Sequence, residues 1–211
     1  MVLKLSLFCD PDVIEVGCDE VGAGCLAGMV CAGAVVWDPT IDSGLVEQIK
    51  DSKVLSASKR GILNEYIKEN AIDYAIGIAT VETIDSFNIK NARFLAMHLA
   101  LDEIKKTNFN HILVDGNMFH TYQNIPHTCL IGGDNSYVSI AAASIIAKVY
   151  RDDYMSDLAK SYPVYDWQNN KGYGTKKHID AIKQFGITEH HRKTFEPVKS
   201  IFAAHLRKFI D

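Results

Sequence analysis

Four acidic side chains lie where carboxylates can share a cation. Asp19 and Glu20 are adjacent in V-G-C-D-E-V-G-A-G, Asp115 closes the apolar run H-I-L-V-D, and Asp134 follows two glycines just before an Ala-rich helical pattern. Carboxylates at strand ends and at a helix start, rather than on solvated faces, indicate a site for hard divalent ions, which prefer oxygen ligands. Two such ions held together are a standard device for cleaving phosphodiesters.

Each of these carboxylates also has an ordinary structural interpretation. Adjacent strand residues point to opposite faces, so Asp19 and Glu20 reach one metal only where the strand ends or bulges. Otherwise Glu20 acts through its backbone carbonyl or on a second ion. The pair can equally lie on the surface before a turn, with Asp115 initiating a turn and Asp134 capping a helix.

The glycine-rich segment 21–28 follows the acidic pair directly. It joins two strand-like runs, 13–18 and 28–37, and has the length of a hairpin connection with room for a bound phosphate. A dinucleotide-binding turn is the rival interpretation. It is disfavoured because the third glycine, Gly28, comes one residue late and the next segment is strand-like. The neighbouring carboxylates would also repel a pyrophosphate in the absence of metal.

Basic and aromatic residues later in the chain suit a phosphate or nucleic-acid partner. Ser144, Lys148 and Arg151 lie along one side of the helix expected over 136–160, at spacings of four and three residues, facing either phosphate or solvent. The loop K-G-Y-G-T carries Tyr173, which could stack on a sugar or base or only anchor the loop.

The charge is unevenly distributed along the chain. The net charge is −4, yet residues 171–208 carry 9 basic against 3 acidic residues, with four histidines. A basic C-terminal surface beside an acidic centre is typical of an enzyme that binds phosphates and holds metal. Ordinary surface lysines are the alternative.

The pattern of elements predicts an α/β domain with a mixed sheet. Strands come first, then alternating elements, then a helical tail. Further strands are expected at 72–80, 111–115 and 127–131. Helices are expected at 43–50, at 56–69 with Ser56 as N-cap, at 90–106, at 136–160 capped by Asn135 or Ser136, at 176–185 and at 198–209.

Length and composition favour a single cytoplasmic domain. The chain has 211 residues, 47% hydrophobic and 23% charged, enough to bury a substantial core. No run of about 18 apolar residues predicts a membrane span, and the N-terminus lacks the features of a signal peptide. Five scattered cysteines without a C-x-x-C pair indicate reduced thiols rather than a zinc site or disulfides.

Seven segments between about residue 14 and residue 198 resemble, in order, the motifs of the ribonuclease HII family, the type 2 ribonucleases H. So many motifs in one order are not expected by chance. They read C-D-E-V-G-A-G-C-L-A-G (18–28), D-S-K-V-L-S (51–56), V-D-G-N (114–117), G-D-N-S-Y-V-S-I-A-A-A-S-I-I-A-K-V-Y-R-D (133–152), Y-P-V-Y (162–165), K-G-Y-G-T-K-K-H (171–178) and H-R-K-T-F (191–195).

The resemblance implies a fold, an activity and a substrate. The fold would be a ribonuclease H-like mixed sheet flanked by helices. About residues 1–160 would form the core, and about 161–211 a helical C-terminal extension that contributes to substrate binding. The activity would be hydrolysis of the RNA strand of RNA/DNA hybrids and incision 5′ of ribonucleotides embedded in duplex DNA, leaving 3′-hydroxyl and 5′-phosphate ends. The family leads us to expect a monomer.

The resemblance also assigns site residues. The family's four carboxylates fall on Asp19, Glu20, Asp115 and Asp134, and they would hold two Mg²⁺ or Mn²⁺ ions about 4 Å apart. The loop Gly22, Ala23 and Gly24 would read the 2′-hydroxyl at an RNA–DNA junction together with Tyr173. Further candidates for contact with the substrate or support of the site are Lys53, Ser144, Lys148, Arg151 and Arg192.

The chain departs from the family in one residue of the glycine loop. The family's Gly-Arg-Gly is Gly22-Ala23-Gly24 here. Loss of a cation that faces phosphate should weaken binding and flatten its salt dependence, so we expect lower activity on a single embedded ribonucleotide than on longer RNA tracts. Two other readings are an integrase-like nuclease, disfavoured by the motifs, and a hybrid-binding protein without turnover, opposed by the four carboxylates.

Overall fold

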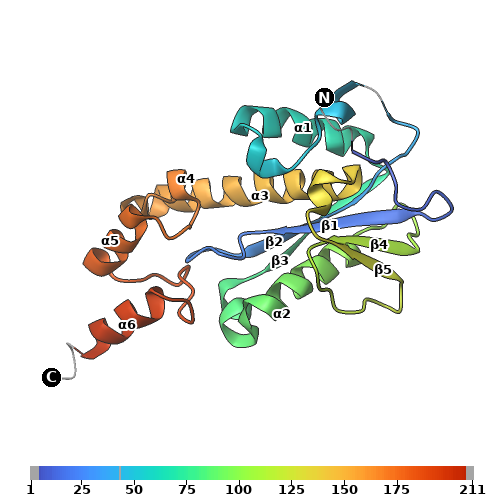
Figure 1. Ribbon diagram of the computed structural model, residues 1–211. Helices are drawn as coiled ribbons and strands as arrows, with labels where there is room; N and C mark the ends of the chain where they lie inside the picture. The colour runs from blue at the N-terminus through green and yellow to red at the C-terminus, as the bar shows by residue number, and fades with distance from the viewer. Residues whose placement is uncertain (1–4, 43, 208–211) are drawn as a thin grey trace. The chain divides into compact units, whose positions relative to one another are not determined.

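The computed structural model (Figure 1) describes residues 5–42 and 44–207 of the chain, which divide into two compact units. The first, which we call the sheet unit, comprises the residues up to Val21, Cys31–Ile78 and Arg93–Val149. The second, which we call the helical unit, comprises Gly22–Val30, Ala79–Ala92 and the residues from Tyr150 onward. The helical unit is therefore assembled from three separate segments of the sequence.

The sheet unit is built on a mixed five-stranded sheet, as the sequence predicts. Its strands are β1 (Glu15–Val21), β2 (Val30–Val36), β3 (Asp73–Ala79), β4 (His111–Asp115) and β5 (His127–Leu130). Their order is β3-β2-β1-β4-β5. β1 pairs antiparallel with β2 and parallel with β4, and β4 pairs parallel with β5. The central strand β1 therefore ends beside the end of β4.

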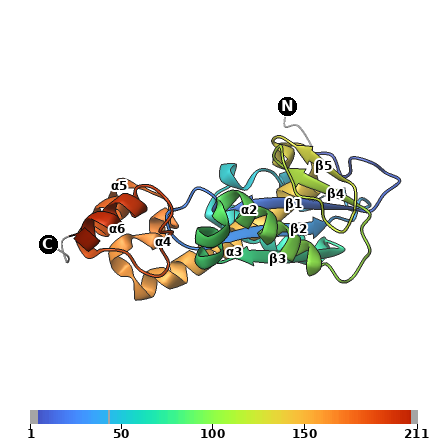
Figure 2. The ribbon, with the colours of Figure 1, turned by 90° about the horizontal axis from the view of Figure 1, so that it is seen from below.

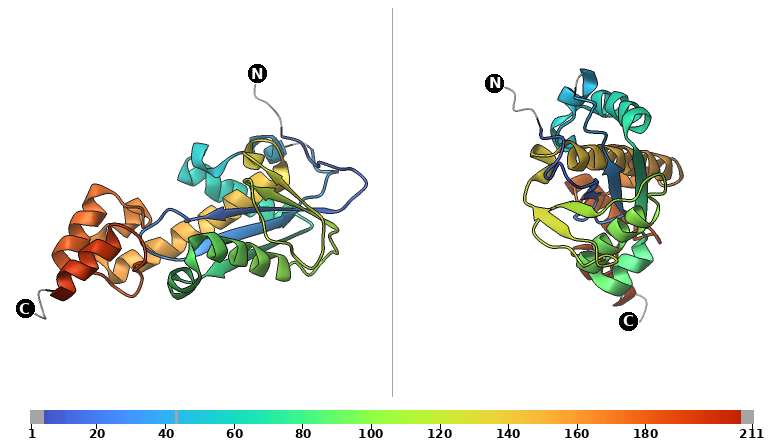
Figure 3. Two further views of the ribbon diagram at one scale, coloured as in Figure 1. Left: turned by 60° about the horizontal axis from the view of Figure 1, so that its bottom comes forward. Right: turned by 90° about the vertical axis from the view of Figure 1, so that its right-hand side faces the viewer.

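Helices cover both faces of this sheet. The helix α1 (Ala57–Asn70) and the N-terminal part of α3 (Val138–Ser161) lie on one face, and the C-terminal part of α2 (Val81–Asp102) lies on the other (Figure 1). Figure 2 looks onto the α2 face, and the right-hand view of Figure 3 shows the layers edge-on. Three short 3₁₀ turns complete the unit: η1 (Gly44–Gln48), η2 (Ser52–Val54) and η3 (Gly133–Asn135).

Two glycines let α3 lie directly against the sheet. A Cβ atom at Gly17 would lie 2.4 Å from the backbone of Ser139, and one at Gly33 would lie 2.3 Å from the carbonyl oxygen of Ala143. Gly33 pairs with Asp19 across β1 and β2, so Asp19 shares the sheet face that α3 covers. Side chains alternate along a strand, so Glu20 points to the opposite face, toward α2.

The helix α2 begins at Val81, well before the start predicted at residue 90. Asn88 interrupts the helix with a φ of 63°, and its Oδ1 accepts the N–H of Asn91 at 3.1 Å. The side chain therefore caps the segment after the kink. The apolar spacing used for the prediction restarts after this kink, so it found only the second part of α2.

The predicted cap of α3 at Asn135 or Ser136 is wrong. Gly133–Asn135 form the turn η3, and Tyr137 then pairs with Ser6 in an isolated bridge before the helix begins at Val138. This non-local pairing keeps the backbone extended where the sequence favoured a cap. The segment predicted as a helix at 43–50 is the 3₁₀ turn η1, and residue 43 lies outside the described residues.

The helical unit contains the N-terminal part of α2, the C-terminal part of α3 and the 3₁₀ turn η4 (Pro163–Tyr165). It also contains the helices α4 (Trp167–Asn170), α5 (Lys176–Phe185) and α6 (Val198–Arg207). The bounds of α5 match the prediction, and Thr175 caps it by accepting the N–H of His178. Residues 208 and 209, predicted to extend α6, lie outside the described residues. No helix in the described part of the chain is long and apolar enough to cross a membrane. The apolar centre of the unit includes Leu26, Ala27, Met155, Tyr165, Trp167, Ile182 and Val198.

Candidate active site

Three of the four predicted carboxylates converge in the sheet unit. Asp19, Asp115 and Asp134 each offer an oxygen, and these atoms all lie within 4.8 Å of one another. Cys18 is in register with Val114 across the parallel strands β1 and β4, so Asp19 and Asp115 are the next residues along neighbouring strands. Asp134 reaches the same point from the turn η3. Topology therefore gathers side chains that are far apart in sequence.

Backbone and side-chain donors orient each carboxylate. The N–H of Glu20 donates to Oδ1 of Asp19 at 2.7 Å, and the N–H of Gly133 donates to Oδ1 of Asp115 at 2.8 Å. Nδ2 of Asn135 donates to Oδ1 of Asp134 at 2.9 Å. These bonds fix one oxygen of each group.

Ser144 supports Asp19 and does not face solvent. It is only 1% exposed, and its hydroxyl lies 2.8 Å from the hydroxyl of the buried Ser52. Ser144 also hydrogen-bonds the carboxylate of Asp19, which opposes the rise in the pKa of that group. The prediction that Ser144 touches the substrate is therefore corrected: its burial confines it to holding Asp19.

The cluster is electrostatically strained. Burial, then the nearby carboxylates Asp115 and Glu20, raise the pKa of Asp19 well above its usual range. Burial, then Asp115 and Asp51, raise the pKa of Asp134 to about 6, while Lys53 acts in the opposite direction. Like charges gathered away from water destabilise one another. A cation placed among them would relieve both effects.

Lys53 lies at the solvent side of this cluster. Its side chain is 75% exposed, and its Nζ is 3.8 Å from Oδ2 of Asp134 and 3.9 Å from Oδ1 of Asp51. Burial lowers the pKa of Lys53, but the surrounding carboxylates outweigh this and leave the pKa raised. Lys53 is thus a mobile positive charge beside the cluster.

Glu20 is directed away from the other three carboxylates. β1 continues regularly to Val21, with Glu20 opposite Ala32, so no strand end or bulge turns both acidic side chains to one face. Oε1 of Glu20 instead lies 3.3 Å from Nη1 of Arg93 in α2. Burial raises the pKa of Glu20, and Arg93 opposes this. Arg93 was not found from the sequence, where nothing marks it as a partner of Glu20.

The donor set fits a hard divalent cation. Three oriented carboxylate oxygens lie within reach of one ion, and two of the three groups, Asp19 and Asp134, have raised pKa values because of burial and mutual repulsion. Mg²⁺ and Mn²⁺ prefer such oxygen ligands. No His or Cys belongs to this group in the part of the chain that is described, which disfavours a zinc site.

In the helical unit, two buried arginines hold the glycine loop 22–29. Arg151 and Arg192 are both 0% exposed. Arg151 donates to the carbonyls of Ala27, Met29 and Lys171 at 2.9–3.0 Å. Arg192 donates at 2.8–3.0 Å to the carbonyls of Gly22, Ala23 and Gly28.

These contacts separate the two roles predicted for the arginines. Each guanidinium is enclosed and uses all three nitrogens on backbone oxygens, so neither contacts a phosphate in this structure. Of the two roles predicted for Arg151 and Arg192, contact with phosphate or support of the site, their burial and their bonds to the loop carbonyls favour support. A Cβ atom at Gly22, where φ is 92°, would lie 2.1 Å from Nε of Arg151, so only glycine fits there.

The segment K-G-Y-G-T packs against the same loop. The carbonyl of Gly172 accepts the N–H groups of Leu26 at 2.8 Å and Ala27 at 3.3 Å. The hydroxyl of Tyr173 interacts with the thiol of Cys25, and the residue is 43% exposed. Gly24 is exposed, with open space where a side chain would project. The helical unit thus presents Ala23, Gly24 and Tyr173 together at its surface.

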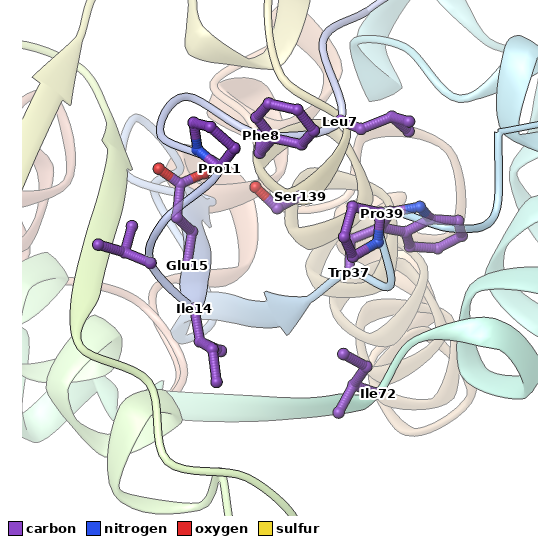
Figure 4. Close-up of a pocket in the computed structure, with 10 residues that line it drawn as sticks. Leu7, Phe8, Pro11, Ile14, Glu15, Trp37, Pro39, Ile72 and Ser139 are labelled. Atoms are coloured by element: carbon purple, nitrogen blue, oxygen red, sulfur yellow. The ribbon is translucent and has the colours of Figure 1, made fainter.

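Two features lie outside these clusters. Lys148, in α3, is partly buried, and its role stays a prediction. A pocket at the opposite end of β1 is lined mainly by apolar side chains, with the carboxylate of Glu15 at one wall (Figure 4). Two oxygens of Glu15 accept the N–H groups of Cys9 and Asp10 at 2.7 and 2.9 Å. None of the predicted site residues lines this pocket.

Comparison with known proteins decides the family. The model of the family described as Ribonuclease HII matches residues 16–198. The chain belongs to the ribonuclease HII family. A Ribonuclease HII from Phocaeicola vulgatus is 51% identical over 188 residues, which cover 89% of this chain and 92% of the relative. The chain is accordingly a metal-dependent ribonuclease of the ribonuclease H type.

Solved structures agree on the fold. The ribonuclease H2 of Pyrococcus horikoshii OT3 superposes with a TM-score of 0.76 at 23% identity, covering 92% of this chain and 99% of that one. Bst-RNase HIII, solved in complex with Mn²⁺, superposes with a TM-score of 0.72 at 20% identity, covering 96% of this chain and 71% of that one. The ribonuclease HII chain therefore has the ribonuclease H-like mixed sheet, flanked by helices, with a helical C-terminal part.

Proposed function

We propose that this chain is an endoribonuclease that hydrolyses the RNA strand of RNA/DNA hybrids. We further propose that it incises 5′ of ribonucleotides embedded in duplex DNA and leaves 3′-hydroxyl and 5′-phosphate ends. The observation that carries the proposal is the convergence of Asp19, Asp115 and Asp134 within 4.8 Å in a chain of the ribonuclease HII family. We propose that it acts as a monomer.

We propose that Asp19, Asp115 and Asp134 hold Mg²⁺ or Mn²⁺ and that Glu20 completes the ligand set by exchanging Arg93 for an ion. Two bound ions would lower the pKa of the attacking water and stabilise the leaving oxygen. The Mn²⁺ complex of Bst-RNase HIII supports this choice of metals. The protein's part is to hold the carboxylates in place through Ser144, Gly133 and Asn135.

Lys53 and the surface of the helical unit would contact the nucleic acid. The exposed ammonium of Lys53 beside Asp134 suits a phosphate oxygen, which would replace the carboxylates as its partner. Gly24 lets a sugar approach the backbone closely, and Tyr173 offers a ring for stacking. Because Ala23 supplies no cation, we propose weaker recognition of a single embedded ribonucleotide than of a long RNA tract.

Cleavage of two substrates tests the activity. One is an RNA/DNA hybrid and the other a DNA duplex with one ribonucleotide, each assayed in Mg²⁺ and in Mn²⁺. Asp115→Asn should abolish cleavage of both, while Asp180→Asn, an exposed carboxylate on α5, should not change it. Cleavage of neither substrate by the unmodified protein would overturn the proposal and favour a binding-only role.

The variant Ala23→Arg tests the role of residue 23. We expect it to raise the ratio of single-ribonucleotide incision to hybrid cleavage and to steepen the salt dependence of binding by about one unit of slope. An unchanged ratio of the two activities would refute this part of the proposal. Ala23→Gln, which adds length without charge, is the matched control.

A further inference from the structure

Two buried histidines of the helical unit form a chain of hydrogen bonds that ends on Tyr173. His178 and His191 are both 0% exposed. Nδ1 of His178 lies 2.9 Å from the carbonyl oxygen of Tyr173, and its Nε2 accepts the indole N–H of Trp167 at 2.9 Å. The Nε2 atoms of the two imidazoles are 3.2 Å apart, and the N–H of Thr188 donates to Nδ1 of His191 at 3.0 Å.

The partners determine which nitrogen of each ring carries the proton. A carbonyl oxygen only accepts, so Nδ1 of His178 must be the donor, and its Nε2 must be the acceptor for Trp167. A backbone N–H only donates, so Nδ1 of His191 is an acceptor and its Nε2 carries the proton. His191 therefore donates to His178. The bonds run in one direction, from Thr188 through both rings to Tyr173.

This directed chain requires both imidazoles to be neutral. Burial, then the adjacent His178 and His190, lower the pKa of His191 to about 3, and burial also lowers the pKa of His178. A second proton on either ring would place two donors face to face. Two titratable groups lie beside the pair: Tyr165, whose ring lies 4.8 Å from that of His191, and His190. Glu189 and Tyr162 in turn contact His190.

The backbone of Tyr173 is held while its ring stays accessible. Its carbonyl also accepts the N–H of Thr175 at 2.8 Å, and its N–H donates to the carbonyl of Asn170 at 2.9 Å. The residue as a whole is 43% exposed. His178 links this carbonyl to the apolar centre around Trp167, because it bonds both groups, and His191 bonds His178 from the other side.

We propose that His178 and His191 are positioning residues for Tyr173, fixing through this directed chain where the tyrosine ring meets the sugar of the substrate. The inference rests on the proposed function, in which Tyr173 contacts the nucleic acid. Neither histidine touches the substrate. Their effect on the reaction passes through the position of one backbone carbonyl, and misplacement by about 1 Å costs up to about a hundredfold in rate.

Two substitutions of His178 separate positioning from stability. In His178→Gln, the amide reaches the place of Nε2, so it can accept from Trp167 but no longer donates to Tyr173. In His178→Asn, the amide nitrogen takes the place of Nδ1, so donation to Tyr173 survives while Trp167 and His191 lose their acceptor. We expect kcat/KM on the single-ribonucleotide duplex to fall about tenfold or more in His178→Gln. In His178→Asn it should stay close to the unmodified value although this variant unfolds at lower urea concentration.

A mutant cycle and a spectrum complete the test. His178→Gln should have little further effect in a Tyr173→Ala background, because coupled residues are not additive. His98→Asn, whose amide does not reach the place of the Nε2 that bonds the carbonyl of His120, is the control and should leave cleavage unchanged. Nitrogen-15 spectra of the histidine rings should show the proton on Nδ1 of His178 and on Nε2 of His191 at pH 7.

Several outcomes would overturn the inference. If kcat/KM falls in parallel with stability, so that His178→Asn is less active than His178→Gln, the role of His178 is merely structural. An undiminished effect of His178→Gln without the Tyr173 ring, or the opposite tautomers in the spectra, would also overturn it. Failure of the unmodified protein to cleave either substrate is a separate result: it would refute the proposed function before any variant is compared, and the tautomers would still decide whether the chain of bonds exists.

Discussion

The two units treat buried polar groups in opposite ways. In the sheet unit, three carboxylates crowd together, and burial and repulsion raise the pKa values of Asp19 and Asp134. In the helical unit, Arg151, Arg192 and the two histidines are equally buried, but each is matched by hydrogen bonds of the right direction. The repulsion among the carboxylates is relieved only when a cation binds among them. The buried arginines and histidines find their partners within the protein and hold the exposed surface of the helical unit in shape.

Removal of Arg192 should lower stability the most, because it takes donors away from buried carbonyls of the helical unit. Arg192→Leu removes a donor from the carbonyls of Gly22, Ala23 and Gly28, of which Gly22 keeps the N–H of Cys25 at 3.3 Å, and each buried unsatisfied group costs about 1–3 kcal/mol. We expect the free energy of unfolding in urea to fall by about 3 kcal/mol or more. Arg192→Lys should recover only part of this, because an ammonium lacks the planar fork. Loss of the exposed Arg207 should lower stability by almost nothing. An equal loss of stability on removal of Arg192 and on removal of Arg207 would contradict the comparison.

Acid should lower the stability of the folded protein through the buried histidine pair. The unfolded chain protonates His191 near its ordinary pKa of 6.5, whereas the folded protein resists protonation down to about 3. Stability is therefore fully present above about pH 6.5 and is lost as the pH falls toward 3, because the unfolded state binds more protons. We expect a loss on the order of 3 kcal/mol between pH 7 and pH 4 from this residue. His191→Gln should flatten the pH dependence of urea unfolding in that window; an unchanged slope would show that the ring is not buried neutral.

Removal of one charge from the acidic cluster should raise stability, whereas the two changes above lower it. Without metal, Asp19→Asn should raise the free energy of unfolding at pH 8 by about 1 kcal/mol, since it relieves repulsion while its amide oxygen still accepts the N–H of Glu20. The unmodified protein should gain stability when Mn²⁺ is added, and the variant should gain much less. Thermal unfolding with EDTA and with Mn²⁺ measures both effects. A destabilised metal-free variant would refute the strained cluster.

The ion pair of Glu20 should matter least for stability. The two side chains are largely buried, at 27% exposed for Arg93 and 14% for Glu20, but burial already raises the pKa of Glu20, so this carboxyl can take up a proton when Arg93 is removed and need not stay charged and unpaired. Arg93→Met should lower the free energy of unfolding by about 1 kcal/mol and tighten Mn²⁺ binding severalfold by releasing Glu20. Calorimetric titration measures the affinity, with Arg93→Lys as the charge-preserving control. Weaker binding in Arg93→Met would show that Arg93 organises the ligand set instead.

Local rules predicted what local physics controls. Ser56 caps α1 as its residue type favours, and the bounds of α5 follow the predicted helix. The meeting of Asp19 and Asp115 depends on the pairing of β1 with β4, so the residues alone did not predict it and the family resemblance was needed. Non-local contacts were out of reach. Nothing in the sequence tells that Arg93 meets Glu20, or that Tyr137 pairs with Ser6 ahead of α3. The sequence left two roles open for Arg151 and Arg192, because arginines are usually exposed and nothing in the sequence shows that these two find enough carbonyl oxygens to be buried.

The bonds that hold the glycine loop have a consequence for how this protein can change over generations. Its shape is specified by main-chain oxygens and by arginines at positions 151 and 192, not by the side chain at position 23, which makes none of these bonds. Residue 23 can therefore be exchanged while the loop is inherited intact. A lineage is free to alter what the loop contacts without having to rebuild the loop itself.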